Sequence, residues 1–155
     1  MGRITLVRHR ERWHPWRHVG KHYPHISVTC AHRLTDGRRG SWTEDGIYID
    51  RDLTQVERRC ALAHEIVHLE RGPLPTDPRL AAIEERVVSI IAARRLIPLD
   101  DLTEALMWVS LEDQAELADE LWVDMPTLRI RLRHLAHEER AHINQELARR
   151  QPWNN

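Results

Sequence analysis

The sequence predicts an α+β fold in which a small antiparallel sheet packs on one long buried helix and is followed by a helical tail. Three observations support this prediction. Strand-like segments and two Asp-Gly turn signals lie before residue 51. Two long segments with the start and stop signals of helices follow, between residues 54 and 98. The remaining residues, 99–155, show helical patterning.

The expected sheet contains two strand-like segments. Apolar and polar residues alternate in Ile26–Cys30, and Gly46–Asp50 is the second expected strand. Asp36-Gly37 and Asp45-Gly46 are dipeptides typical of tight hairpin turns, which join antiparallel neighbours. We therefore expect an antiparallel sheet with residues 47–50 at its edge.

The first long helix is expected to begin after Thr54. Thr54 and Glu57 have the spacing of a capping box, in which two side chains satisfy free backbone amides at the start of a helix. Gly72-Pro73 ends the segment after about 17 residues, or roughly 25 Å. Two apolar lines along the helix predict that it is mostly buried, one formed by Val56, Cys60, Ala63 and Val67 and the other by Leu62, Ile66 and Leu69.

The second half of this helix carries the pattern H-E-x-x-H, from His64 to His68. At 3.6 residues per turn, the two histidines lie on one face about 6 Å apart along the axis, so both imidazoles can reach one zinc ion. Glu65 lies beside them, and a carboxylate that is not itself a ligand can take the proton of a water molecule that attacks a carbonyl carbon. The pattern therefore predicts a zinc-dependent hydrolase of peptide bonds, with Glu65 as its catalytic base.

A catalytic zinc site needs a third protein ligand and keeps one position open. Asp77-Pro78 and Pro98 bound a second predicted helix, residues 78–97, which carries Glu84 and Glu85 in its first half. Glu84 shares its side of the helix with larger apolar residues and stays open as an alternative ligand. We favour Glu85, because the residues on its side are small and allow close packing against the metal: Ser89, Ala92 and Ala93.

The two predicted helices resemble those of a known family, the ImmA/IrrE metallopeptidases. In that family an H-E-x-x-H helix is followed by a helix of the form E-x-x-A-N-x-F-A-A-x-L-L-x-P. The present chain departs from the family at Val67, where glycine is usual, and at Ser89, where Asn or Asp is usual. With residues 46–50 and 60–63 the resemblance covers roughly the middle third of the chain, and the second helix matches at Glu85, Ala92, Ala93, Leu96 and Pro98.

The resemblance implies a zincin-like metallopeptidase core with a gluzincin-like site. One Zn²⁺ ion would be bound by His64, His68 and Glu85, with Mn²⁺ as a substitute in vitro. In this architecture the small sheet packs on the active-site helix, and its edge strand pairs with the substrate backbone. The resemblance also implies a protein substrate, a small helix-turn-helix repressor that is cut to derepress a phage, a mobile element or a stress regulon.

The tail contains a second pattern, Ala115–Leu132, that looks like a helix-turn-helix. Ala118 and Leu128 are ten residues apart, as packing in that motif requires, and residues 122–124 form the turn. The first helix is acidic, which disfavours close approach to phosphates, whereas three arginines give the second helix phosphate-binding charge: Arg129, Arg131 and Arg133. We favour a structural helix pair. The alternative is a DNA- or partner-binding regulator whose metal site is structural or inactive.

Length and composition suit one compact domain, or one domain with a helical appendage. The 155 residues are 41% hydrophobic and carry a net charge of −1. We assign residues 1–98 to the metallopeptidase core and residues 99–155 to the helical tail. The alternative is that the core and the tail pack as one domain. No stretch approaches 18 apolar residues, and the start Met1–Arg8 is too short and too charged for a signal peptide. We therefore expect a cytoplasmic protein with no membrane partner.

Overall fold

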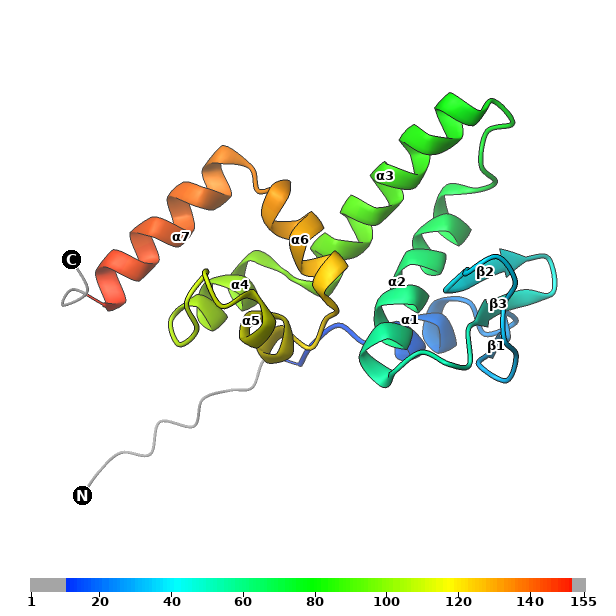
Figure 1. Ribbon diagram of the computed structural model, residues 1–155, viewed down its shortest axis with the longest axis horizontal. Helices are drawn as coiled ribbons and strands as arrows, with labels where there is room; N and C mark the ends of the chain where they lie inside the picture. Colours follow the sequence, from blue (N-terminus) through cyan, green and yellow to red (C-terminus); the bar gives the residue numbers. More distant parts are fainter. Residues whose placement is uncertain (1–10, 152–155) are drawn as a thin grey trace, which may run out of the picture.

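The computed structural model describes residues 11–151, which form a three-stranded sheet and seven helices (Figure 1). The stretch Met1–Arg8, whose sequence is too short and too charged for a signal peptide, lies outside the described residues. None of the helices within residues 11–151 is both long enough and apolar enough to span a membrane. The elements in chain order are α1 (Pro15–His22), β1 (Val28–Thr29), β2 (Gly40–Thr43), β3 (Gly46–Ile49), α2 (Gln55–Arg71), α3 (Pro78–Leu96), α4 (Leu99–Leu106), α5 (Gln114–Leu121), α6 (Met125–Arg133) and α7 (His137–Arg150).

The sheet is mixed, with the strand order β1-β3-β2. β2 pairs with β3 in the antiparallel sense, but β1 pairs with β3 in parallel, so the prediction of an antiparallel sheet was wrong for β1. The reason lies in the connection from β1 to β2. Its turn at Asp36 and Gly37, with φ angles of 58° and 67°, does not join paired strands, because β2 lies on the other side of β3.

β3 was expected at the edge of the sheet and lies instead at its centre. Its side chains Ile47 and Ile49 are fully buried. A strand with buried apolar side chains is stabilised most when it has a paired strand on both sides. The apolar pattern alone did not distinguish a central strand from an edge strand. The edge strands are β1 and β2.

α2 begins and ends where the sequence predicts. The hydroxyl of Thr54 accepts a hydrogen bond from the backbone amide of Glu57 at 3.2 Å, and the Glu57 carboxylate accepts one from the amide of Thr54 at 2.8 Å, which completes the capping box. The sheet and α3 lie on different sides of α2 (Figure 1). Both predicted apolar lines are buried except at Val56 and Leu69, which are half-buried. Leu62 and Ile66 pack in the cluster of the sheet, and Cys60, Ala63 and Val67 pack in the cluster of the other helices.

α3 returns alongside α2 in the opposite direction (Figure 1). The Asp77 carboxylate caps its start by accepting hydrogen bonds from the amides of Arg79 and Leu80. The helix ends at Leu96, one residue before the predicted end. This return brings the first half of α3 against the second half of α2, which carries the H-E-x-x-H pattern.

α5 and α6 form the expected helix pair, joined by residues 122–124. Trp122 has a left-handed backbone with φ 56°, a conformation that glycine usually adopts at the end of a helix. The Arg59 guanidinium of α2 donates a hydrogen bond to the Trp122 carbonyl at 2.8 Å. The central carbon of the same guanidinium lies 5.4 Å from the centre of the Trp122 ring. These contacts hold the turn against α2.

Side chains from both sides of residue 98 share one hydrophobic cluster. Val88 and Ala92 of α3 belong to it, as do Leu102 of α4, Leu128 of α6 and Ile143 of α7. The division into a core of residues 1–98 and a tail of residues 99–155 stays a prediction.

Arg131 is buried inside the tail, with 2% of its surface exposed. Its guanidinium donates two hydrogen bonds to the Glu139 carboxylate, at 3.0 and 2.7 Å, and one to the Ile97 carbonyl at 2.8 Å. These bonds tie α6 to the end of α3 and the start of α7. Although the sequence marks Arg131 as a phosphate-binding candidate, its charge is used within the fold.

We expect Glu139→Gln to destabilise the protein by about 2 kcal/mol at pH 7, because it removes a charged partner of Arg131. The Arg131 guanidinium lowers the pKa of Glu139 to about 2. The stabilisation is therefore complete above the usual carboxyl pKa and is lost as the pH falls toward 2. Urea unfolding over this pH range measures the effect. Glu138→Gln, at the exposed neighbouring position, is the control, and an equal loss in both variants would contradict the prediction.

Candidate metal centre

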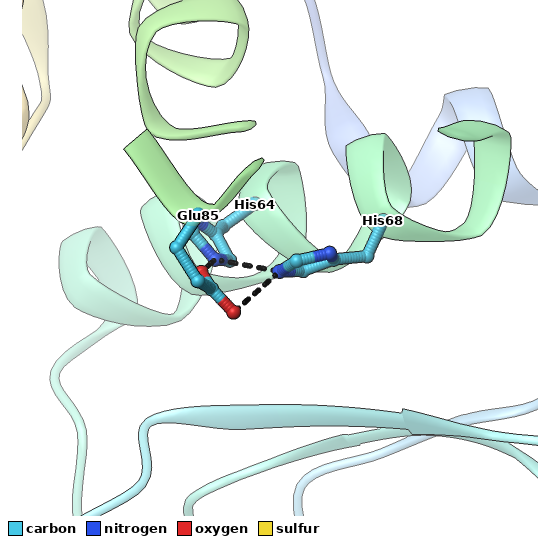
Figure 2. Close-up of side chains that lie close together, drawn as sticks. All are labelled: His64, His68 and Glu85. Carbon is cyan, nitrogen blue, oxygen red and sulfur yellow. Dashed lines mark hydrogen bonds and ion pairs between the residues drawn. The ribbon is translucent and has the colours of Figure 1, made fainter. Parts of the chain in front are cut away.

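His64, His68 and Glu85 meet between α2 and α3, and their side chains point toward one another (Figure 2). Nε2 of His64 lies 3.1 Å from Nε2 of His68 and 3.1 Å from Oε2 of Glu85. Nε2 of His68 lies 3.2 Å from Oε1 of Glu85. Two imidazoles and one carboxylate therefore converge from two helices.

This cluster fits a divalent metal ion. Two histidines and a glutamate are a common ligand set of catalytic zinc. Ligand atoms at about 2.1 Å from a tetrahedral ion lie about 3.4 Å from one another, close to the separations observed here. Within residues 11–151 no other group of three potential ligands is gathered in this way. The described part of the chain thus has one candidate metal site.

Glu84 lies outside the cluster. Its carboxylate accepts two hydrogen bonds from the guanidinium of Arg71, in the last turn of α2. The same guanidinium holds the pKa of Glu84 below its usual range. Of the two glutamates that the sequence left open, the structure brings Glu85 to the histidines.

The surroundings of His64 favour a neutral ring. Burial, and next the neighbouring His68, hold the pKa of His64 below its usual range, against the opposing effect of Glu85. A neutral imidazole has the lone pair that binds a metal. The hydroxyl of Ser89 lies 3.5 Å from Nδ1, the ring nitrogen that is not in the cluster. A polar group in this place orients a ligand ring.

Glu65 is buried beside the cluster and lies against the start of β2. Burial, and next the charge of Glu85, raise the pKa of Glu65 to about 7, while Arg38 acts in the opposite direction. A carboxyl group that titrates near neutral pH can both accept and release a proton there. The environment of Glu65 therefore suits a general base.

Gly40 makes room for Glu65. A Cβ atom at Gly40 would lie 2.8 Å from both Cγ and Oε1 of Glu65, closer than such atoms normally approach. Sequence reasoning missed this residue. An isolated glycine in a strand is a general signal that another group approaches the backbone closely, and Gly40 is the first residue of β2.

A cavity of about 840 Å³ contains the site. It is lined by all four residues of β2, by the active-site face of α2 and by α3. α6 contributes Pro126, Thr127 and Ile130 to the same cavity. Sequence reasoning missed these three residues too, because their position depends on how the tail packs against the core.

The buried H-E-x-x-H helix and the glutamate supplied by the next helix define a metallopeptidase. A family model described as the IrrE N-terminal-like domain, Peptidase_M78, matches residues 28–133. The chain belongs to this family, which confirms the family expected from the sequence and implies a zincin-like core. No curated protein and no solved structure matches the chain.

Glu85→Gln should lower bound metal at least about tenfold, because the variant loses a charged ligand. Glu84→Gln, one residue away, should keep its metal because Glu84 contacts Arg71. Mass spectrometry of the metal content after dialysis against trace Zn²⁺ compares the two variants. Equal retention, or loss only in Glu84→Gln, would show that Glu85 is not a ligand.

Gly40→Ala should lower kcat about a hundredfold on any peptide that the wild type cleaves, because the new methyl group displaces Glu65. Metal content should not change. The control is Gly20→Ala, where a Cβ atom meets nothing within 4 Å. Thermal unfolding provides a second test. If the new methyl group clashes with Glu65, Gly40→Ala should lower the melting temperature much less in a Glu65→Ala background than in the wild type. Full turnover by Gly40→Ala would disprove the clash.

Proposed function

We propose that the protein is a zinc endopeptidase in which His64, His68 and Glu85 bind one Zn²⁺ ion and Glu65 is the general base. The observation that carries the proposal is the convergence of three donor atoms, 3.1–3.2 Å apart, next to a buried carboxylate in one cavity. Structural zinc sites have four protein ligands, whereas three ligands leave a position for catalysis. Mn²⁺ is the expected substitute in vitro.

A bound zinc ion would supply Lewis acidity, polarising the scissile carbonyl group and making water easier to deprotonate. Glu65 accepts a proton from the attacking water and then donates it to the departing amine. The close contact with β2 at Gly40 keeps this carboxylate out of bulk water. Ser89 supports His64 from its other ring nitrogen.

We assign substrate backbone binding to β2. This strand pairs with β3 on one side only, and it lines the cavity that holds the candidate ligands. A substrate in an extended conformation can add to such an edge through main-chain hydrogen bonds. β2 thus takes the role that the sequence analysis gave to residues 47–50.

The proposed substrate is a small helix-turn-helix repressor, whose cleavage derepresses a phage, a mobile element or a stress regulon. The support is the resemblance of the two ligand-bearing helices to those of the ImmA/IrrE metallopeptidases. Such repressors act on DNA inside the cell, so the proposal includes a cytoplasmic location.

Direct DNA binding by the tail, the alternative function, has less support. Arg131 is bonded to Glu139 and is buried. The first residues of α6, which would read base edges in a helix-turn-helix, line the cavity. Duplex binding that is salt-sensitive and is lost on replacing the exposed Arg129 and Arg133 would favour this alternative.

Glu65→Gln should keep near-stoichiometric zinc and lose at least about a thousandfold in turnover, because the amide cannot accept the proton from water. The measurement is cleavage of the repressor encoded next to the gene, read on a gel with and without chelator. Metal content of the same preparation is the control. A wild-type protein without zinc, or a Glu65→Gln variant that still cleaves, would refute the catalytic assignment.

A further inference from the structure

A row of apolar side chains runs along the face of α3 that turns away from the metal centre. Its four members are spaced by three, four and three residues, which places them on one side of the helix over about 15 Å. Helical pitch puts this side roughly half a turn around the axis from Glu85. We call this row the α3 stripe, and its residues are Leu80, Ile83, Val87 and Ile90.

The α3 stripe is left outside the hydrophobic core of the described residues. Leu80 and Ile83 are 54% and 51% exposed, and Val87 and Ile90 are half-buried. None of the four belongs to either hydrophobic cluster or lines the cavity. The first half of α3 lies beside α2, and α6 lies near the other end of the helix (Figure 1). A row of neighbouring apolar side chains at the surface marks a site for another molecule.

The spacing of the α3 stripe indicates the shape of that molecule. Intervals of three and four residues keep apolar side chains along one seam, as in a helix that packs lengthwise against a second helix. A seam of about 15 Å matches about three turns of a partner. The occupant that fits is therefore an amphipathic helix.

The charges that border the α3 stripe indicate the chemistry of the partner. Arg79 and Arg86 are exposed and lie seven residues apart along one border. Neither guanidinium has an acidic partner in the described part of the chain, and Arg86 donates only to the Ala82 carbonyl of its own helix. On the other border, Glu84 is already paired with Arg71. The free border charge is thus positive, and acidic side chains would complement it.

A second copy of α3 does not provide this complement. In an antiparallel pair, the two-fold axis brings the same border of both helices together, so Arg79 and Arg86 would face the same arginines of the copy. In a parallel pair, they would face the border that carries Glu84, whose carboxylate is already bonded to Arg71. An acidic helix of another protein avoids both conflicts.

We propose that the α3 stripe, together with Arg79 and Arg86, binds an acidic amphipathic helix of a partner protein. The docked helix lies on the side of α3 away from His64 and His68 and leaves the cavity open. A partner and a substrate can therefore be bound at the same time. The proposal does not depend on the peptidase function.

Fluorescence anisotropy with the full-length protein tests the proposal. The probes are two labelled helical peptides of about 21 residues, with the same leucines at the apolar positions and either glutamate or lysine at the bordering positions. The acidic peptide should bind at least about tenfold more tightly than the basic one. Leu80→Glu should weaken binding of the acidic peptide at least about tenfold, and Arg86→Glu should reverse the preference between the peptides.

Two matched variants at other exposed positions are the controls. Leu111→Glu replaces a leucine that is 53% exposed, close to the value for Leu80, and Arg129→Glu reverses the charge of an exposed arginine of α6. Both should bind the acidic peptide as the wild type does. Equal binding of the two peptides, binding of neither, or equal losses in the stripe variants and the controls would overturn the proposal.

Two further measurements test other occupants of the α3 stripe. Analytical ultracentrifugation should show a monomer, and a dimer that Leu80→Glu dissociates would overturn the proposal in favour of a second copy. The protein should not sediment with phosphatidylglycerol vesicles. Vesicle binding that is lost in Leu80→Glu would overturn the proposal in favour of an anionic membrane surface.

Discussion

The burial of α2 on two sides is the constraint on which the rest of the structure depends. The sheet covers one side of this helix and the other helices cover the opposite side, so the polar groups buried between them need partners within the protein. Arg59, the largest fully buried side chain, donates to the carbonyls of Trp122 and Trp13. His64 and His68 meet Glu85 at the cavity. The same burial that stabilises α2 therefore selects the few positions where polar side chains converge.

The burial of α2 on two sides also makes the tail and the metal site parts of one packing arrangement. Arg59 holds the turn before α6, and Asp124 joins that turn to Arg39 beside β2. β2 in turn lies against Glu65 at Gly40. A change in the position of α6 would thus reach the Glu65 carboxylate through two contacts. The first turn of α6, in a helix pair with the pattern of a DNA-binding motif, lines the same cavity as the candidate metal ligands.

The features that sequence predicted well are those encoded over a few residues. The capping box at Thr54 and the cap at Asp77 set where α2 and α3 begin, and helical pitch alone placed His64 and His68 on one face. Features that depend on distant segments were not predictable in this way. The parallel pairing of β1, the central position of β3 and the contact between Gly40 and Glu65 all require the folded arrangement of the sheet on α2.

The two departures from the ImmA/IrrE pattern lie in different environments. Val67 is 1% exposed and belongs to the hydrophobic cluster shared with α3 and the tail, and it is absent from the cavity lining. A β-branched side chain there adds apolar packing to that cluster. Ser89 does line the cavity, and its hydroxyl lies 3.5 Å from Nδ1 of His64. Serine keeps a polar group at the supporting position but removes the reach of Asn or Asp, so of the two departures it is the one that bears on how firmly the ligand ring is held.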